Sequence, residues 1–346
     1  MPLAGLSPTK YEWDGMVTAT MKAAVNDRYG PPDVIRIRQV PKPEPGSTDV
    51  LVRVHATTVS RTDCAALRAH PFFARAFTGL LRPRNTILGM DFAGEVEAVG
   101  PEVRSLAPGD RVFGLAPNGY GGHAEYLCMS ESGAIAAMPA RTRFAEAVVC
   151  EGALYADNYL QGFGLQPGHT ILVYGASGAI GTAAVQLAKA YGATVTAVVA
   201  TRHLDLARFL GADRVIDYTA QDFTATGETY DFILDAVGKA SFFRCRGLLK
   251  PHGTFSATDF GPHNQNLFHL LWSAITRNKR FIFPIPRSRK SFVDFLRSRI
   301  EAGEFRAVID RRYSLETIVD AYRYVETGQK TGIVVVDVTP ASGRSA

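Results

Sequence analysis

The pattern of apolar and polar positions divides the chain into two regions. Between residues 21 and 138, short strand-like segments are separated by turn residues. Residues 50–54 mix apolar and polar side chains, and residues 94–100 alternate them. This period of two predicts a β-rich region. Between residues 145 and 303, apolar runs of strand length alternate with helical repeats. That alternation predicts a parallel sheet covered by helices.

The second region contains six segments with the length and composition of strands. They cover residues 170–174, 194–199, 214–216, 230–235, 253–257 and 280–283. Six parallel strands form a complete doubly wound sheet. A helix at 315–327 and a β-branched strand at 331–338 follow, and we expect them to return to the first region. We therefore predict a disordered extension at 1–20, a β-rich domain at 21–144 completed by 305–340, and a nucleotide-binding domain at 145–304.

Three glycines follow the first of these strands. The apolar run 171–174 leads directly into Gly175, Gly178 and Gly181, and a helical pattern comes next. Such a turn lets a phosphate approach the backbone, because the first N–H groups of the helix are free and lie at the positive end of its dipole. We predict that the turn binds the pyrophosphate of a dinucleotide. Its residues are Gly175, Ala176, Ser177, Gly178, Ala179, Ile180 and Gly181.

The end of the second strand distinguishes between the two nicotinamide dinucleotides. An NAD site usually has an acid there to bind the ribose 2′-hydroxyl, whereas this chain has none between Val198 and His203. The guanidinium of Arg202 and the hydroxyl of Thr201 suit a 2′-phosphate. We therefore predict NADPH, with His203 and Tyr218 beside the same pocket. The alternative for Arg202 is a solvated position in the first turn of a helix at 204–210.

Two further segments reach the carboxyl edge of the predicted sheet, where ligands of open α/β sheets bind. Ala236, Val237 and Gly238 follow the fourth strand, and Ser256, Ala257 and Thr258 follow the fifth. We predict that both segments line the nicotinamide end of the cofactor site.

Composition and charge are those of an ordinary globular protein. The chain of 346 residues is 46% hydrophobic and 21% charged, and its net charge is +5. Much of that charge lies in a basic cluster of Arg277, Lys279, Arg280, Arg287, Arg289 and Lys290. The cluster lacks the interleaved aromatic residues of a stacking platform for nucleic acid. We expect a solvated face and no nucleic-acid partner.

Cysteine usage and apolar runs indicate the compartment. The 4 cysteines, Cys64, Cys128, Cys150 and Cys245, are scattered and no two have metal-ligand spacing, which suits a reducing compartment. The first twenty residues contain no sustained apolar segment, and the run 267–275 is too short to span a bilayer. We expect a cytoplasmic protein without a membrane partner.

Several motifs, in order and with the expected spacing, carry a family resemblance. They are residues 21–24, 87–100, 109–112 and 124–126, the glycine turn, and residues 210–218 and 249–251. Over residues 21–338 the chain resembles the medium-chain dehydrogenase/reductase superfamily. The resemblance implies an α/β fold class, with a Rossmann doubly wound parallel sheet, a GroES-like β-rich catalytic domain and a cleft between them.

The zinc-ligand positions of that superfamily are changed in this chain. Zinc-dependent relatives have a cysteine just before a Thr-Asp pair, where this chain has Ser60, and a Gly-His-Glu motif, where it has Gly89-Met90-Asp91. The replacing groups bind zinc poorly, and the four-cysteine structural loop is missing from the sequence. The resemblance therefore implies the zinc-free, quinone-oxidoreductase-like branch, with no metal. Relatives also tend to have Lys or Asn after the glycine of the final strand, where Ile333 follows Gly332.

The reaction that fits these residues is NADPH-dependent hydride transfer to a quinone or to the double bond of an enone or alkenal. The enolate-like oxygen that forms needs a hydrogen-bond donor. The catalytic candidates are Asp91, Tyr155 and His123, and a structural role is the alternative for each. We expect the Phe- and Arg-rich loop at 70–85 to border the mouth of the substrate site.

Two other functions fit the same residues. One is a zinc-free carbonyl or alcohol oxidoreductase, and the other is a redox-inactive NADPH-binding regulatory module that uses the basic cluster as an interface. The substrate is a small molecule that the sequence does not name. The apolar run 281–286 predicts a sheet edge, and the resemblance implies that two Rossmann domains pair there in a homodimer.

Overall fold

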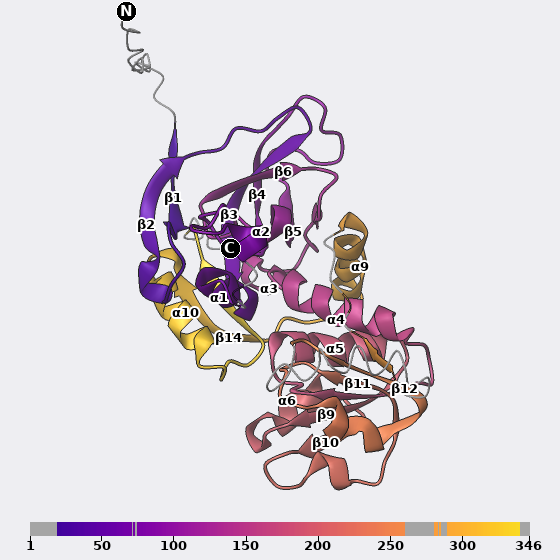
Figure 1. Ribbon diagram of the computed structural model, residues 1–346. Helices are drawn as coiled ribbons and strands as arrows, with labels where there is room; N and C mark the ends of the chain where they lie inside the picture. The colour runs from indigo at the N-terminus through magenta and orange to yellow at the C-terminus, as the bar shows by residue number, and fades with distance from the viewer. Residues whose placement is uncertain are drawn as a thin grey trace, which may run out of the picture.

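The molecule has two lobes, each built on a sheet, with helix α4 (Cys150–Phe163) between them (Figure 1). The computed structural model describes residues 19–70, 72, 75–259, 280–282, 284 and 289–339. The C-terminal segment, yellow in Figure 1, lies beside the indigo N-terminal strands. The two ends of the described chain therefore belong to the same lobe.

The β-rich lobe contains a seven-stranded sheet in the order β14-β15-β3-β4-β5-β7, with β6 also paired to β3, and a separate pair β1-β2. The strands are β1 (Thr20–Val25), β2 (Arg36–Pro41), β3 (Asp49–Val59), β4 (Asp91–Val99), β5 (Arg111–Leu115), β6 (Tyr126–Ser130), β7 (Ile135–Ala137), β14 (Ile309–Ser314) and β15 (Ile333–Asp337). Val50, Leu51, Val52 and Val54 on β3 are all buried, so this strand is covered on both faces and does not show a period of two. β1 begins at Thr20, so the extension expected at 1–20 was too long; residues 1–18 lie outside the described residues.

The second lobe contains a six-stranded sheet in the order β10-β9-β8-β11-β12-β13. The strands are β8 (Thr170–Tyr174), β9 (Thr194–Val199), β10 (Arg214–Asp217), β11 (Tyr230–Asp235), β12 (Leu249–Ala257) and β13 (Arg280–Ile282). All neighbouring pairs are parallel. The strand order reverses between β8 and β11, which is the topological switch point of a doubly wound sheet. The predicted fold class is therefore confirmed.

One strand starts earlier than the sequence predicts. β12 begins at Leu249 instead of residue 253, because its pairing with β11 continues through an irregular register. His252 has a φ of 65° in that irregular stretch, which a short apolar run cannot reveal. Phe283, the expected last residue of the sixth strand, lies outside the described residues.

Helices cover both sheets. Besides α4 they are α1 (Arg61–Arg68), α2 (Arg75–Thr78), α3 (Phe144–Ala147), α5 (Ala179–Ala190), α6 (Leu204–Phe209), α7 (Phe242–Cys245), α9 (Lys290–Glu301) and α10 (Ile318–Glu326). Short 3-10 turns are η1 (Pro32–Val34), η3 (Pro117–Gly119), η4 (Thr201–His203), η5 (Phe223–Ala225), η6 (Arg246–Leu248) and η8 (Leu315–Thr317). The helix expected at 315–327 is therefore divided between η8 and α10.

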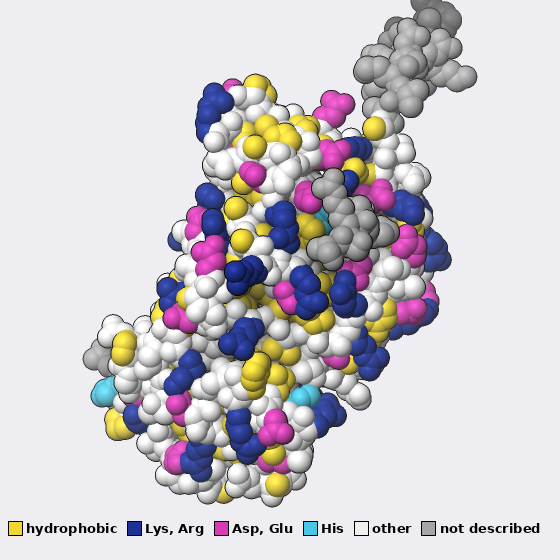
Figure 2. All heavy atoms as spheres, turned by 180° about the vertical axis from the view of Figure 1, so that it is seen from behind, with side chains coloured by type: hydrophobic (Ala, Val, Ile, Leu, Met, Phe, Trp, Pro, Cys, Tyr) yellow, Lys and Arg dark blue, Asp and Glu magenta, His cyan; other side chains and the backbone are white. Residues whose placement is uncertain are grey.

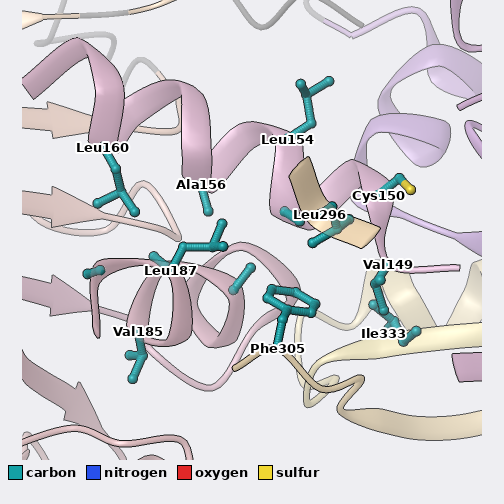
Figure 3. Close-up of a cluster of buried hydrophobic side chains, with 14 of the residues drawn as sticks. Val149, Cys150, Leu154, Ala156, Leu160, Val185, Leu187, Leu296, Phe305 and Ile333 are labelled. Atoms are coloured by element: carbon teal, nitrogen blue, oxygen red, sulfur yellow. The ribbon is translucent and has the colours of Figure 1, made fainter. Parts of the chain in front are cut away.

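An apolar core joins the two lobes around α4 and α5. Figure 3 shows Leu154 and Leu160 of α4 above Leu187 of α5, with Ile333 of β15 close to Val149. All of these side chains are buried. Complete burial of one such side chain stabilises a fold by about 1.5–3 kcal/mol. Because the same cluster contains residues of both sheets, α4 holds a fixed position between them.

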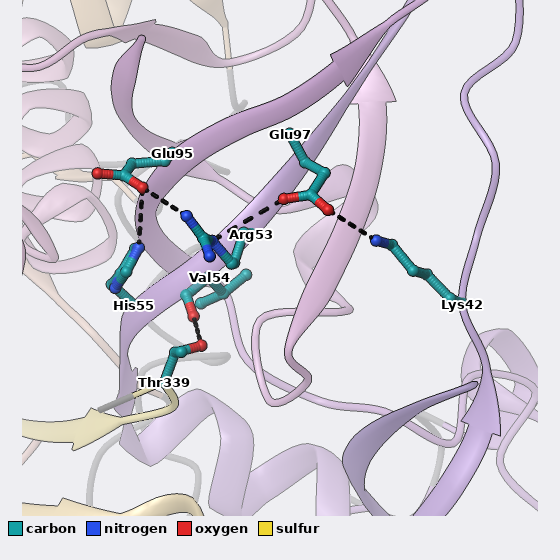
Figure 4. Close-up of polar contacts among 7 residues, drawn as sticks. All are labelled: Lys42, Arg53, Val54, His55, Glu95, Glu97 and Thr339. Carbon is teal, nitrogen blue, oxygen red and sulfur yellow. Dashed lines mark hydrogen bonds and ion pairs between the residues drawn. The ribbon is translucent and has the colours of Figure 1, made fainter. Parts of the chain in front are cut away.

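The last strand ties the end of the chain to β3. β15 pairs antiparallel with β3, with Val336 opposite Thr57. The hydroxyl of Thr339 donates to the Val54 carbonyl at 2.7 Å (Figure 4). The C-terminal segment thus completes the β-rich sheet, as expected, whereas the exact domain limits stay a prediction.

A row of charged side chains crosses β3 and β4 (Figure 4). Lys42 Nζ lies 3.0 Å from Glu97, and Arg53 Nη2 lies 2.8 Å from Glu95. His55 stacks on Phe144 with ring centroids 4.4 Å apart, and burial lowers the pKa of its imidazole. Half-exposed ion pairs contribute at most about 1 kcal/mol each. Apolar packing, more than this row, holds the lobe together.

Candidate active site

The glycine turn between β8 and α5 has the shape of a phosphate site. Gly175 has a φ of 77°, which side-chain-bearing residues rarely adopt. A Cβ on Gly181 would overlap the Gly175 carbonyl oxygen, so α5 starts tightly against the turn. A Cβ on Gly178, the N-cap, would meet only Gly175 O, at 3.9 Å. The space over Gly178 and the free first N–H groups of α5 fit the pyrophosphate of a dinucleotide.

The start of β15 meets this turn. The Gly332 N–H donates to Ser177 O at 2.7 Å, and Gly332 and Gly178 form a parallel bridge. Lys330 Nζ donates to Gly332 O at 2.6 Å. Ile333 offers no polar group at the position where relatives tend to have Lys or Asn, but Lys330 brings an ammonium beside Gly332 from three residues upstream. Burial lowers the pKa of this ammonium to about 8, and Glu151 opposes that effect.

The residues predicted for the 2′-phosphate gather at the carboxyl end of β9. Thr201, Arg202 and His203 form η4, directly after the strand. The Tyr218 N–H donates to Val199 O at 3.1 Å, which places Tyr218 beside them. The exposed guanidinium of Arg202 donates from Nε to His203 Nε2 at 3.0 Å. The structure therefore brings all four residues together.

An acid from the neighbouring strand also lies in this pocket, although the segment 198–203 itself contains none. The Thr201 hydroxyl donates to Asp217 Oδ2 at 2.7 Å. β9 and β10 are parallel neighbours with Val199 opposite Asp217, so the end of β10 supplies the carboxylate that β9 lacks. Hydrogen bonds from Thr201 and Thr219 lower the pKa of Asp217. Its position at the end of the third strand was the signal available in the sequence.

The turn after β11 faces the glycine turn. A buried carboxylate, Asp235, accepts from the N–H groups of Val237 (3.0 Å), Gly238 (2.9 Å) and Ala240 (2.6 Å) and so fixes the turn. A Cβ on Gly175 would lie 2.6 Å from Val237 Cγ1. Ala236, Val237 and Gly238 therefore stand at the switch point, where a ligand of this fold binds.

Ser256, Ala257 and Thr258, at and just after the end of β12, contribute less than expected. Ser256 and Ala257 are fully buried, and the Ser256 hydroxyl donates to the Ile282 carbonyl of β13 at 2.6 Å. That hydroxyl is used within the sheet. Thr258, whose N–H donates to Asp235 O at 3.0 Å, is the residue of the three that reaches the carboxyl edge.

A cavity of about 580 Å³ lies where the β-rich lobe meets α4. Its apolar wall includes Leu88, Met90 and Leu115, and Thr62, Asp63 and Tyr155 supply polar groups. Gly152, on the same helix as Tyr155, packs against the first residue of α5, because a Cβ there would lie 3.0 Å from Ala179 O. One helix thus links the cavity to the glycine turn.

Tyr155 is the catalytic candidate that lines the cavity. Burial, and then the charge of Glu151, raise the pKa of its phenol, and the Thr62 side chain opposes the shift. The phenol therefore keeps its proton at neutral pH and can donate a hydrogen bond into the cavity.

Asp91 lies behind the cavity wall. It is 1% exposed and accepts from the Glu151 N–H at 2.8 Å and from the Thr58 hydroxyl at 3.0 Å. These bonds tie the start of β4 to the start of α4. Burial and the charge of Glu151 raise the pKa of Asp91 well above its usual value.

His123 is also buried away from the cavity lining. Its Nε2 lies 2.8 Å from Thr58 O, and its Nδ1 lies 3.4 Å from the Tyr322 hydroxyl. Burial lowers the pKa of this imidazole to about 4, so the ring is neutral near pH 7. The contacts suit a ring that donates from Nε2 and accepts at Nδ1.

Known proteins resemble the chain in sequence and in fold. The model of the alcohol dehydrogenase GroES-like domain matches residues 46–140, and that of the zinc-binding dehydrogenase matches residues 210–336. A 2-methylene-furan-3-one reductase of Solanum lycopersicum is 32% identical over 94% of this chain and 81% of its own. An NADPH-dependent alkenal/one oxidoreductase of Arabidopsis thaliana is 30% identical over 94% of this chain and 82% of its own. The quinone oxidoreductase from Coxiella burnetii, a solved structure, has a TM-score of 0.82 at 27% identity, covering 93% of this chain and 100% of that chain.

These matches decide the family. The chain belongs to the quinone-oxidoreductase-like branch of the medium-chain dehydrogenase/reductase superfamily. It is an oxidoreductase that uses a nicotinamide cofactor. The family, fold class and enzyme class expected from the sequence are confirmed.

In this enzyme, Ser60 and Met90 occupy the positions of two zinc ligands of other family members and make different contacts. Ser60 is the N-cap of α1, and its hydroxyl accepts from the Asp63 N–H at 3.1 Å. Met90 lines the cavity with its thioether side chain. The described part of the chain contains no group of three or more His, Cys, Asp or Glu side chains arranged to hold a metal ion.

Two buried acids at the cavity were not predicted from the sequence. Asp63 accepts from Gly89 N at 3.1 Å and from Ser60 N at 2.9 Å. Glu151 is 7% exposed and lies one helical turn before Tyr155 on α4. A glutamate in the first turn of a helix is normally a solvated residue, so only its spacing from Tyr155 could have indicated this position.

The loop at 70–85 does not line the main cavity among the described residues. Asn85 instead borders a second cavity of about 320 Å³, which shares Pro117, Asn118 and Tyr120 with the first. Leu80 and Leu81 are 69% and 87% exposed. The loop thus reaches the substrate region from the side of the second cavity.

Surface charge is mixed. Figure 2 shows Lys and Arg side chains interspersed with Asp and Glu over one face. In the basic cluster, Lys290 donates from Nζ to Ile135 O at 3.0 Å and so contacts the β-rich lobe, whereas Arg277, Lys279 and Arg287 lie outside the described residues. None of the described helices has the length and apolar character needed to cross a membrane.

Proposed function

We propose that the enzyme is an NADPH-dependent reductase of quinones or of activated double bonds in enones and alkenals, acting without zinc. The observation that carries this proposal is the position of α4. Its Tyr155 lines the apolar cavity, and its Gly152 touches Ala179 at the start of α5. A substrate in the cavity and a dinucleotide on the glycine turn would therefore meet along one rigid helix.

The cofactor supplies the hydride, and the chain supplies its binding and orientation. The turn at Gly178 leaves room for the pyrophosphate. Arg202 and Thr201 are the residues that would contact a 2′-phosphate. The Nε of Arg202 donates to His203, and its guanidinium forms no ion pair with any residue that the structure describes. A guanidinium recognises phosphate through two parallel hydrogen bonds. These contacts support NADPH over NADH.

The residues in and around the cavity have separate roles in the reaction. Leu88, Met90 and Leu115 exclude water from the reacting carbon. Tyr155 donates a hydrogen bond, and then a proton, to the oxygen on which negative charge develops. Asp91 and His123 are positioning residues, because each binds backbone or side-chain groups outside the cavity.

Zinc independence is part of the proposal. Ser60 is engaged in the cap of α1, and a thioether replaces the usual imidazole at Met90. Elemental analysis of purified enzyme should find far less than one zinc per chain. Stoichiometric zinc that a chelator removes together with activity would contradict this part.

A panel of acceptors tests the reaction. NADPH oxidation is measured with quinones, enones, alkenals, saturated aldehydes and alcohols under the same conditions. We expect turnover with quinones or with the conjugated carbonyl compounds, and little with the saturated ones. Turnover confined to aldehydes or alcohols would favour a carbonyl or alcohol oxidoreductase, and binding of NADPH without turnover would favour a regulatory module.

We also propose a cytoplasmic homodimer with a small-molecule substrate and no nucleic-acid or membrane partner. β13 is the last strand of the described sheet, beside β12, and its Phe281 is buried. An exposed strand edge favours pairing with a second copy. Sedimentation at micromolar concentration should show a dimer, and a strictly monomeric species would contradict this assembly.

A further inference from the structure

An ammonium group lies beside the glycine turn without a carboxylate partner. Among the residues that the structure describes, the carbonyl of Gly332 is the one hydrogen-bond partner of Lys330, at 2.6 Å from Nζ, and no Asp or Glu forms an ion pair with it. An ammonium has three N–H donors, so two of them remain available. Lys330 is only partly exposed, and a partly buried charge normally pairs with an opposite one.

The backbone that carries Lys330 is fixed on both sides. The Thr331 N–H donates to Asp310 Oδ2 at 2.8 Å, and the Gly332 N–H donates to Ser177 O at 2.7 Å. Gly332 has a φ of 60°, a conformation that favours glycine. Because this backbone is tied to the turn and the Lys330 side chain bonds back to it, the ammonium is held next to the turn.

The acids near Lys330 have other contacts. Asp310 Oδ2 accepts from the Thr331 N–H and also from the Tyr324 hydroxyl, at 2.7 Å. The charge of Glu151 favours the ammonium, but its carboxylate is not within ion-pair distance of Lys330 in the described structure. The ammonium is therefore attracted by two carboxylates without being paired with either.

A second cation lies close to Lys330. A Cβ on Gly328 would lie 3.4 Å from Arg61 Nη1, so the first residue of α1 reaches the segment before β15. The charge of Arg61 lowers the pKa of Lys330, and within the described part of the chain Arg61 has no ion pair either. Neighbouring cations repel each other, and an anion bound beside them relieves that repulsion. This arrangement is typical of a site for an anionic ligand.

We propose that Lys330 is a cofactor-binding residue, whose available N–H groups bind the pyrophosphate of the dinucleotide on the glycine turn. The inference rests on the proposed function, which places the pyrophosphate over Gly178. Gly178 and Gly332 form a bridge, so the ammonium that bonds to the Gly332 carbonyl lies at the edge of this space. The first N–H groups of α5 and the Lys330 ammonium then act on the same phosphate groups.

The two cations and the turn belong to different lobes. Lys330 lies just before β15 and Arg61 lies at the start of α1, so both are part of the β-rich lobe. The glycine turn joins β8 to α5 in the other lobe. A pyrophosphate held by both would link the two lobes through the cofactor itself.

Binding of ADP-ribose tests the assignment, because this ligand has the pyrophosphate but neither the 2′-phosphate nor the nicotinamide. Titration calorimetry should show a loss of affinity of about tenfold or more in Lys330→Gln. Lys330→Arg keeps the positive charge and should lose much less. Arg202→Ala should weaken binding of NADPH but not of ADP-ribose. The matched control is Lys22→Gln on β1, whose ammonium pairs with the exposed Glu316 at 3.3 Å, and it should bind like wild type.

Proton uptake on binding gives a second readout, which wild type alone supplies. Burial lowers the pKa of Lys330 to about 8, and the charged or titratable groups that act on it are Arg61 and Cys64 on α1, Glu151 on α4 and Asp310 on β14. A bound anion raises the pKa of a neighbouring ammonium. At about pH 8, binding of ADP-ribose should therefore take up as much as about half a proton, seen as a binding heat that depends on the buffer. Lys330→Arg should lose this uptake, since a guanidinium does not titrate there.

Unchanged affinity for ADP-ribose in Lys330→Gln would overturn the assignment. If that variant does not fold, the proton uptake of wild type decides, and its absence would overturn the assignment as well. Binding that depends on Lys330, in an enzyme that reduces no acceptor, would support the assignment and contradict the proposed reaction. A wild type that does not bind ADP-ribose would contradict both the assignment and the pyrophosphate site at the glycine turn.

Discussion

The pKa values of acidic side chains are shifted in opposite directions in two parts of this enzyme. Burial raises the pKa values of Asp63 and Glu151, beneath α4, to about 6 and about 7. At the end of β10, hydrogen bonds from Thr201 and Thr219 lower the pKa of Asp217, which is partly exposed. All three side chains are carboxylic acids, so their surroundings determine the pH at which each one becomes charged.

This difference separates the chemistry of the enzyme from its recognition of the cofactor. Beneath α4 a carboxyl group can hold and release a proton near neutral pH, which suits proton transfer. At the end of β9 the charges are fixed and hydrated, which suits discrimination between two dinucleotides. The glycine turn, with Gly178 at its N-cap, lies between the two parts.

The largest expected effect is at the turn itself. Gly178→Val should abolish NADPH binding, because the new side chain occupies the space over the turn. Thermal unfolding without cofactor should barely change, since no atom but Gly175 O lies within 4 Å of the added Cβ. The stabilisation by NADPH, about 2.7 kcal/mol at a hundredfold excess over Kd, should vanish.

Gly247→Val is the matched control for that variant. A Cβ on Gly247 also meets open space, but Gly247 lies in η6, away from the glycine turn. It should keep the full NADPH effect. A Gly178→Val protein that is still stabilised by NADPH would show that the phosphate binds elsewhere.

The next effect distinguishes the two dinucleotides. Arg202→Ala should weaken NADPH binding about 10- to 100-fold, as expected for a charge-assisted pair of about 1.5–3 kcal/mol, and leave NADH unchanged. Asp217→Asn should act in the opposite direction, because it removes a negative charge beside Thr201. Titration calorimetry with both cofactors measures each value.

Arg208→Ala on α6 is the control for charge alone, since Arg208 pairs with the exposed Asp205 at 2.9 Å. It should affect neither cofactor. Equal losses of NADPH affinity in the Arg202 and Arg208 variants would mean that no 2′-phosphate contact exists at η4.

A smaller effect concerns stability and pH. The native state holds the Glu151 proton up to about pH 7, whereas the unfolded chain releases it near pH 4.5, so rising pH in this interval favours unfolding. Glu151→Gln should therefore gain stability relative to wild type as the pH rises, by up to about 1.4 kcal/mol per pH unit. Melting curves between about pH 5 and pH 8 measure this difference.

Asp217→Asn should show the opposite sign. The pKa of Asp217 is lowered in the folded protein, so its contribution to stability is present above the unfolded value and is lost in acid. Relative to wild type, this variant should become less stable as the pH rises from about 3 to about 5. If the stability of both variants, relative to wild type, changed in the same direction as the pH rises, the two regions would not differ in the way proposed.

The smallest change in a pH profile is expected from His123. Because the pKa of its imidazole is about 4, the ring does not titrate between about pH 5 and pH 8. His123→Gln should cost about 1–3 kcal/mol of stability through the buried Thr58 carbonyl, yet keep the wild-type dependence of kcat on pH. A lost titration limb in this variant would make His123 a proton-transfer residue.

Local patterns were sufficient for most of the fold. The apolar runs correctly predicted the bounds of β8, β9 and β11, and the glycines after β8 predicted the turn. These features could be predicted because each signal lies within a few residues of the sequence. The bounds of β12 were missed, since its irregular register depends on the neighbouring strand.

The candidate site was harder to predict, because distant segments build it. Asp217 lies beside Thr201 only through the pairing of β10 with β9. Burial, and then the charge of Asp63 on another element, raise the pKa of Glu151, and Lys330 reaches the turn from the segment before the last strand. No spacing within one segment records such contacts.

The bridge between Gly332 and the glycine turn constrains how the enzyme is made. The turn itself is complete once α5 has emerged from the ribosome, but its contact through Ser177 needs the start of β15. β15 in turn pairs with β3, which is synthesised near the beginning. A nascent chain that lacks β15 therefore has both an unfinished sheet and an unsupported cofactor turn. We therefore expect the cofactor turn to gain this support only after most of the chain has been made, because contacts this distant in sequence form slowly.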